Sequence, residues 1–129
     1  MEVAVEAKQN STTGGTGKLV ENLGLQQGDL LTITCDFQDQ WNLSQDGGFS
    51  TNANGISTHP IAIGTANQTF SAGAMVGSFN NGQSFFSVGL FTQITVTESG
   101  DSPELRLYCV DSDKDNNSGF IRVVVKKSN

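Results

Sequence analysis

Short stretches in which polar and apolar residues alternate recur along the whole chain, and no long window repeats its apolar residues at helical period. Alternation with a period of two places every second side chain on one face, the pattern of a half-buried β-strand. It predicts strands over residues 2–7, 18–22, 29–35, 74–79, 84–97, 104–110 and 119–126. Turn signals such as Gly14-Gly15 and Asn81-Gly82 separate these segments. The spacing predicts an all-β fold, a small jelly-roll β-sandwich of two antiparallel sheets.

Length and charge limit what such a sandwich can do. A chain of 129 residues is large enough for one core, so we expect a single domain over residues 1–129. Seven Lys and Arg against thirteen Asp and Glu cannot supply the basic footprint that nucleic acids require. No apolar stretch approaches the roughly twenty residues of a membrane helix. We therefore expect no nucleic-acid partner and no integral membrane segment.

The first residues alternate polar and apolar, without the basic region and apolar core of a signal peptide. This predicts a chain that is cytoplasmic at synthesis, with any release to the cell exterior by a non-classical route. Cys35 and Cys109 fall within predicted strands and lack the spacing of metal ligands. Buried free thiols are the expectation, and a disulfide between them is the alternative. No Gly-x-Ser-x-Gly elbow or reactive Cys/His neighbourhood is visible, so we expect a binding protein and not an enzyme.

Residues 111–119, Asp-Ser-Asp-Lys-Asp-Asn-Asn-Ser-Gly, join two predicted strands and are rich in oxygen ligands. Calcium takes roughly six to eight oxygens from carboxylates, carboxamides, carbonyls and water. The side chains that offer such oxygens are those of Asp111, Asp113, Asp115, Asn116 and Asn117. The segment is not an EF-hand, because Asn116 stands at the sixth position instead of Gly and Arg122 at the twelfth instead of Glu. It predicts a calcium loop, with a solvated acidic turn as the alternative.

Between residues 37 and 72 the alternation dissolves into a polar, glycine-containing stretch. This stretch holds the only Trp and the only His of the chain, Trp41 and His59. A loop of such length in a small domain is usually functional. We expect it to fold over the acidic loop and complete its site.

Several strings of the sequence resemble those of one protein family. They are Gln27-Gly28-Asp29-Leu30-Leu31-Thr32-Ile33, His59-Pro60, Gly73-Ala74-Met75-Val76, Gly89-Leu90-Phe91 and Asn116-Asn117-Ser118-Gly119-Phe120. Their order, and nearly their spacing, is similar to that of the bacterial galactose-specific calcium lectins of the PA-IL (LecA) type. The resemblance covers nearly the whole chain and is most specific in its C-terminal half.

The resemblance implies a jelly-roll sandwich that binds sugar through one calcium ion, with two vicinal hydroxyls of galactose completing the coordination shell. It implies metal ligation by the side chains of Asp111, Asn116 and Asn117, which would also contact the sugar. It further implies backbone carbonyl ligands at Trp41 and Asp113.

The resemblance also implies residues that contact the sugar but not the metal, and an assembly. His59 matches the histidine that hydrogen-bonds the primary hydroxyl. The Trp41 indole is expected near the sugar, where it could stack, and packing in the core or at its rim is the alternative. A homotetramer follows from the family as the expected assembly. The expected partners are galactose-type glycans and glycoconjugates.

Two departures from the family pattern leave alternatives open. The loop is two residues shorter, so Asp113 could ligate by its carbonyl or its carboxylate, or Lys114 could replace it. Ile61 and Ala62 stand where a glutamine should follow His59-Pro60. Two other functions are also compatible with the residues: a calcium-stabilised structural or adhesion module without a sugar site, and a hydrolase. A hydrolase would use two of the Asp carboxylates at roughly 5 to 9.5 Å separation.

Overall fold

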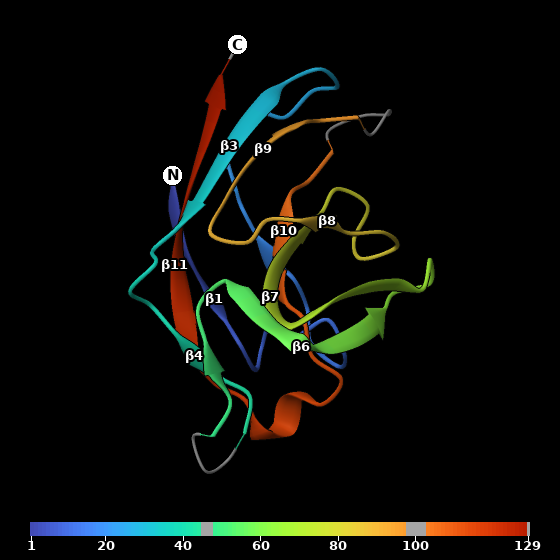
Figure 1. Ribbon diagram of the computed structural model, residues 1–129. Helices are drawn as coiled ribbons and strands as arrows, with labels where there is room; N and C mark the ends of the chain where they lie inside the picture. The colour runs from blue at the N-terminus through green and yellow to red at the C-terminus, as the bar shows by residue number, and fades with distance from the viewer. Residues whose placement is uncertain (45–47, 98–102, 129) are drawn as a thin grey trace.

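The computed structural model describes residues 1–44, 48–97 and 103–128. Figure 1 shows two β-sheets packed face to face, and the strands within each sheet pair antiparallel. The elements are β1 (Glu2–Glu6), β2 (Lys18–Leu19), β3 (Leu30–Cys35), β4 (Trp41–Asn42), β5 (Ser50–Thr51), β6 (Asn54–Ile63), β7 (Gln68–Ser78), β8 (Phe86–Ser87), β9 (Phe91–Thr95), β10 (Arg106–Cys109), the 3₁₀ helix η1 (Lys114–Asn116) and β11 (Ser118–Ser128). The predicted all-β sandwich of two antiparallel sheets is confirmed.

The first sheet is organised around β11. Its strand order is β5-β4-β11-β3-β9, and β1 pairs with β11 as well. Because side chains alternate along the strand, Ile121, Val123 and Val125 point into the core while Arg122 lies on the outer face. The strand predicted over residues 119–126 therefore forms with the predicted inward face.

The second sheet is organised around β7, in the order β2-β10-β7-β6, with β8 also on β7. Side chains on both faces of β10 are buried. Leu107 and Cys109 of β10 pack in the main core, while Tyr108 belongs to a smaller cluster, where its ring meets Phe85 edge-on at 5.1 Å. Cys35 and Cys109 are buried free thiols, as the sequence predicts, and burial raises the pKa of Cys35 to about 12.

The stretch between residues 37 and 72 is not one long loop, which corrects the expectation from its pattern. It contains β4, β5, β6 and the first part of β7. β4 and β5 have two residues each, too few to show alternation. β6 is mostly exposed, and its few core contacts, made by Ile56, Ile61 and Ile63, are interrupted by a register shift between Ile56 and Pro60, so they show no regular alternation. Conversely, the strand expected over residues 84–97 is divided into β8 and β9, between which Gly89 has a positive φ of 61°.

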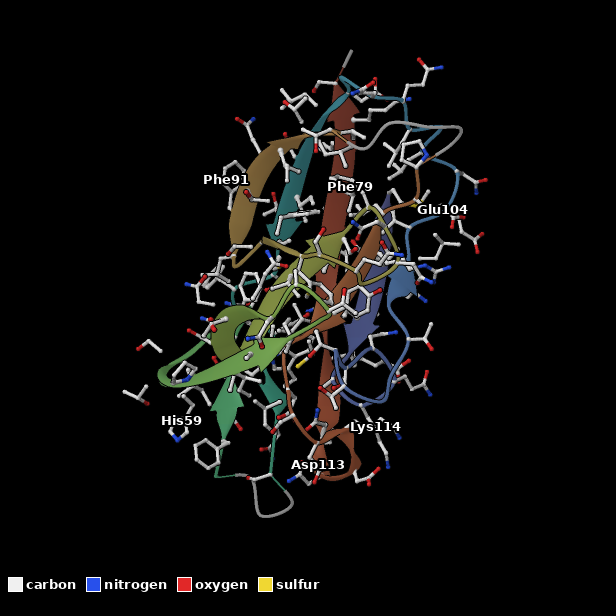
Figure 2. The ribbon with its side chains drawn as sticks, turned by 90° about the vertical axis from the view of Figure 1, so that its right-hand side faces the viewer. His59, Phe79, Phe91, Glu104, Asp113 and Lys114 are labelled. Atoms are coloured by element: carbon white, nitrogen blue, oxygen red, sulfur yellow. The ribbon has the colours of Figure 1, made fainter. Side chains whose placement is uncertain are left out.

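Loops from both sheets meet at one end of the sandwich. Figure 1 places η1 and β4 at this end. Figure 2 shows His59 and Asp113 there, with Glu104 and Phe91 far away toward the other end. In the described part of the chain, no helix has the length and apolar character needed to cross a membrane.

Candidate functional site

The acidic loop is folded by its own polar groups. The Asp113 side chain caps η1, since its Oδ1 accepts the Asp115 N–H at 3.0 Å. At the other end of η1, the Asn117 N–H donates to the Lys114 carbonyl at 3.0 Å. The Asp113 carboxylate and the Lys114 carbonyl are thus used within the turn, whereas the Asp113 carbonyl faces the Asn116 side chain.

The Asn116 amide faces three oxygens at once. One end of it lies 3.1 Å from Asn117 Oδ1, 3.0 Å from the Asp113 carbonyl and 3.1 Å from the Leu43 carbonyl. With the nitrogen at this position, an NH₂ group has two hydrogens for three acceptors. With the oxygen there, four oxygens converge, an arrangement that a cation stabilises.

Asp111 adds a buried carboxylate beside this group. The residue is buried, and its Oδ2 is a buried side-chain oxygen for which the described residues provide no hydrogen-bond partner. Its Oδ1 accepts the Ser112 N–H at 2.7 Å. Burial raises the pKa of Asp111, and the Ser112 N–H and the Asn117 amide lower it by less. Without a cation, the structure therefore disfavours the charged form of this carboxyl.

We call these five groups the oxygen cluster: the Asp111 carboxylate, the Asn116 and Asn117 amides, and the carbonyls of Asp113 and Leu43. Asn117 is held by its nitrogen, which donates to the Ala7 carbonyl at 2.9 Å, so that its oxygen turns toward Asn116. Asp111, Asp113, Asn116 and Asn117 are thus brought together as the sequence analysis expects. The donor set of one carboxylate, two amides and carbonyls suits a hard cation such as calcium.

The Trp41 indole lies in the core and does not line the pocket described below, which corrects the expectation that it lies near the sugar. Its indole is 1% exposed and donates to the Gly73 carbonyl at 2.8 Å, so it cannot stack on a sugar. The carbonyl that faces Asn116 belongs to Leu43, two residues later. The sequence analysis missed Leu43 because a backbone carbonyl leaves no signal in residue type.

Gly73 explains why the indole fits in the core. A Cβ at this position would lie 2.5 Å from Thr51 Cγ2, and its φ of 80° is one that side chains rarely adopt. Its N–H donates to the Val110 carbonyl at 2.7 Å. Gly73 of β7 is therefore hydrogen-bonded both to Trp41, two residues before Leu43, and to Val110, the residue before Asp111.

An open pocket of about 430 Å³ adjoins the oxygen cluster. It is lined by Leu43, Phe49, Thr58, His59, Pro60, Ile61, Ala72, Asp111 and Ser112. The His59 ring is exposed, shares a hydrogen bond of 3.0 Å with the Thr58 hydroxyl through Nδ1, and meets the Phe49 ring edge-on at 4.9 Å. The expectation that the stretch of residues 37–72 lies over the acidic loop is confirmed, because this pocket joins the two.

The remaining carboxylates of the loop point away from the cluster. The Asp113 carboxylate caps η1, and Asp115 is exposed and pairs with Lys114 at 3.5 Å. Among the described residues, no three His, Cys, Asp or Glu side chains gather closely enough to hold a metal. A cation at the oxygen cluster would therefore depend on amide and backbone carbonyl oxygens, which the side chains of these four residue types do not supply.

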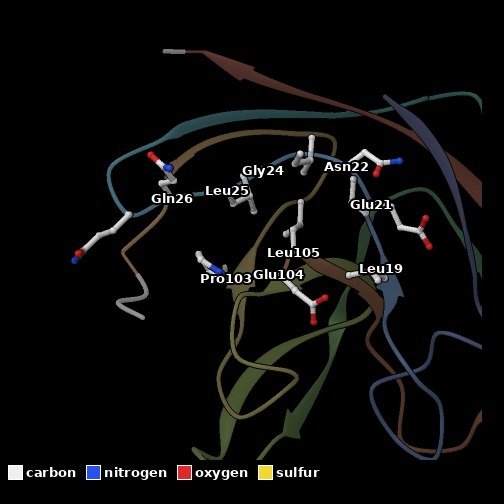
Figure 3. A pocket seen from close by; sticks show the side chains of 12 residues that line it. Leu19, Glu21, Asn22, Gly24, Leu25, Gln26, Pro103, Glu104 and Leu105 are labelled. Atoms are coloured by element: carbon white, nitrogen blue, oxygen red, sulfur yellow. The ribbon is translucent and has the colours of Figure 1, made fainter. Parts of the chain in front are cut away.

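A wider groove of about 750 Å³ lies elsewhere on the molecule, lined by residues 19–27 and 103–105 (Figure 3). Its carboxylates, Glu21 and Glu104, are exposed, and Glu104 lies 3.9 Å from Arg106. None of the residues predicted for the site lines it. Convergent, partly buried polar groups mark a ligand site better than volume does, so we place the candidate site at the smaller pocket.

The molecule is a β-sandwich whose loops gather buried oxygens beside a pocket at one end. One solved structure with this fold is the "EclA N-terminal domain; PllA-like lectin", with a TM-score of 0.59 and 18% sequence identity. The match covers 98% of this chain and 95% of that one. This likeness shows the fold. No protein-family model matches the sequence, and no curated protein does.

Proposed function

We propose that this protein is a calcium-dependent lectin that recognises galactose-type sugars. The observation that carries the proposal is the oxygen cluster, in which the Asn116 amide meets three oxygens within 3.1 Å beside the unpartnered Oδ2 of Asp111. A buried polar atom without a protein partner, as Oδ2 of Asp111 is among the described residues, calls for an explanation such as a bound ion. The lectin fold of the similar solved structure supports a carbohydrate as the ligand.

The donor set fits calcium. The Asp111 carboxylate, the amide oxygens of Asn116 and Asn117, and the carbonyls of Asp113 and Leu43 provide five protein ligands, and calcium takes about six to eight oxygens. Leu43 takes the role that the family resemblance gave to Trp41, and Asp113 ligates by its carbonyl. When bound, the ion offers its remaining positions to two vicinal sugar hydroxyls.

The pocket suits a single sugar residue. Its volume of about 430 Å³ is in the range of small-ligand sites, which is roughly 300 to 1,000 Å³. His59, with Nδ1 engaged by Thr58, has Nε2 for a sugar hydroxyl, and we assign it the primary hydroxyl by resemblance. Phe49 and Ile61 offer apolar surface to the C–H face of a sugar. Because Ile61 and Ala62 replace the family's glutamine, fewer hydrogen bonds hold the primary hydroxyl than in the family.

We infer binding without turnover. A glycosidase needs two carboxylates that flank the scissile bond, and the carboxylates of Asp113 and Asp115 are occupied outside the pocket. Of the three aspartates in the loop, only Asp111 lines the pocket. A carboxyl that binds a metal ion must be ionised, whereas one that acts as a general acid must be protonated, so Asp111 cannot do both at once.

We propose a homotetramer as the working assembly. A shallow site that grips a sugar by two hydroxyls binds weakly. Several sites on one assembly raise avidity by a factor of roughly 10² to 10⁴ where geometry permits. Glycoconjugates that display several terminal sugars are the corresponding partners.

Titration calorimetry with galactose, in calcium and after EDTA, tests the proposal. Heat is expected from galactose in calcium only, and mannose and fucose serve as specificity controls. Asp111→Asn should abolish the heat. Asp115→Asn, which removes an exposed carboxylate four residues away, should retain it and is the matched control. Calcium binding without sugar heat would favour a structural or adhesion module, and release of galactose from a chromogenic galactoside would indicate a hydrolase.

A further inference from the structure

The segment that follows β1 lies against the strand end that carries Asp111. The Cys109 N–H donates to the Asn10 carbonyl, and the Thr12 N–H donates to the Cys109 carbonyl, both at 2.9 Å. Ser11 pairs with Cys109 as an isolated parallel bridge and is fully buried. Residues nearly one hundred positions apart in the sequence thus form a short backbone bridge just before the oxygen cluster.

Thr12 holds both backbone groups of Asp111. Its hydroxyl donates to the Asp111 carbonyl at 3.1 Å and accepts the Asp111 N–H at 3.1 Å. These two bonds fix the peptide groups on either side of Asp111 and therefore the direction of its side chain. A hydroxyl can do this because it is donor and acceptor at once.

The same segment orients a second member of the oxygen cluster. The Ala7 carbonyl accepts the Asn117 amide nitrogen at 2.9 Å, a buried hydrogen bond between residues 110 positions apart. An amide whose nitrogen is engaged on one side presents its oxygen on the other. Ala7 is fully buried, and its N–H donates to the Gly119 carbonyl at 3.1 Å, so the acceptor is itself held in place.

We propose that Ala7 and Thr12 form a positioning clamp that sets the calcium affinity of the oxygen cluster without contributing a ligand. This inference rests on the proposed calcium site. The clamp holds the Asp111 carboxylate and the Asn117 oxygen in the geometry for binding before calcium arrives, so the ion does not have to order them. Partners that orient metal ligands typically account for roughly 10- to 100-fold in affinity.

Variants at Thr12 test the clamp with calcium chloride alone, by calorimetry. Thr12→Val keeps the shape and removes the hydroxyl, and we expect calcium to bind about tenfold more weakly. Thr12→Ser restores the hydroxyl and should bind within about twofold of the unaltered protein. Thr13→Val, at the exposed next position, is the matched control and should leave the affinity unchanged.

Melting temperatures in EDTA separate positioning from general stability. A purely structural role predicts that Thr12→Val lowers the melting temperature in EDTA while calcium affinity stays at that of the unaltered protein, and this result would overturn the proposal. A clamp predicts lower affinity, with rescue by Thr12→Ser. If calcium fails to bind the unaltered protein, the proposed calcium site itself is wrong, which is a different outcome.

Amide hydrogen exchange on the unaltered protein keeps the test independent of any variant. Calcium should slow exchange of two amides. They are the Asp111 N–H, which donates to the Thr12 hydroxyl, and the Thr12 N–H, which donates to the Cys109 carbonyl. The Ile94 N–H in β9 serves as a remote reference and should not change. Equal exchange at Asp111 and Thr12 with and without calcium, in a protein that binds calcium, would contradict the clamp.

Discussion

Two acidic regions of this molecule treat their carboxylates in opposite ways. On the outer face of the first sheet, Arg122 forms a two-pronged pair with Asp39, through Nε at 2.9 Å and NH2 at 2.8 Å, and its N–H adds a third bond at 2.8 Å. Asp36 lies 3.3 Å from the same guanidinium. Hydrogen bonds from Arg122 lower the pKa of Asp39 to about 2. This region carries its own cation.

The oxygen cluster has no such partner among the described residues. Its carboxylate, Asp111, is buried and has a raised pKa, and the nearby cation, Lys114, pairs with the exposed Asp115 instead. The Lys114 chain also lies over Gly14, away from the cluster. The comparison teaches that density of acidic residues does not define a metal site. The proposed calcium site rests instead on an anion that the fold buries and leaves without an internal cation among the described residues.

The largest expected effect comes from Asp111→Asn, which removes that anion. In EDTA at pH 7 the variant should melt higher than the unaltered protein. A raised carboxyl pKa contributes stability only below the unfolded value near pH 4, and this is lost as the pH rises through the folded value. In calcium the order should reverse, because calcium at about 1,000 times its Kd stabilises by roughly 4 kcal/mol, on the order of ten degrees. Differential scanning calorimetry measures both; a lower melting temperature in EDTA would contradict the assignment.

Asn116→Asp sharpens the contrast by adding a second anion without an internal cation. The new carboxylate would face the Asn117 oxygen and the carbonyls of Asp113 and Leu43 with no hydrogen to donate. We expect a lower melting temperature in EDTA and a larger rise on adding calcium than in the unaltered protein. Equal calcium-induced shifts in the two proteins would count against Asn116 as a ligand. Asn52→Asp, in the turn before β6, controls for added charge.

Arg122→Gln breaks the other half of the comparison. Because the Asp39 pKa is lowered, its pairing stabilises the fold above pH 4, and this stability is lost as the pH falls toward about 2. Without Arg122, the acid-dependent loss should be smaller between pH 4 and 2, with a modestly lower melting temperature at pH 7, because the guanidinium is half exposed. Unfolding in urea at several pH values measures this. An unchanged pH slope would mean that the pair contributes nothing.

The smallest effect is expected where the two regions are tested against each other. Arg122→Gln should leave calcium affinity within about twofold, since sites with no shared partners behave nearly additively. Calorimetric titration with calcium chloride is the measurement. A tenfold change would show that the surface pair and the oxygen cluster are coupled through β11.

The sequence predicted those parts of the fold in which pattern and burial agree. Ile121, Val123 and Val125 alternate and lie in the core, so β11 was predictable. β6 was not, because its side chains are mostly exposed and a register shift between Ile56 and Pro60 interrupts its apolar residues.

For the site, the sequence pointed to the side chains of Asp111, Asn116 and Asn117, which the fold brings together. It could not indicate the Leu43 carbonyl, because every residue type carries one. Nor could it decide between an indole near the sugar and one in the core, and the structure places Trp41 in the core.

The buried indole of Trp41, which donates a hydrogen bond to Gly73, is an intrinsic fluorescent probe. Trp41 is the only tryptophan of the chain, it is fully enclosed, and it lies two residues before Leu43. Gly73, which accepts its N–H, also donates to the residue before Asp111. The ultraviolet emission of the Trp41 indole therefore comes from a core position that hydrogen bonds connect, through Gly73, to Val110 next to Asp111. Binding at the oxygen cluster can be followed in the native protein without a dye.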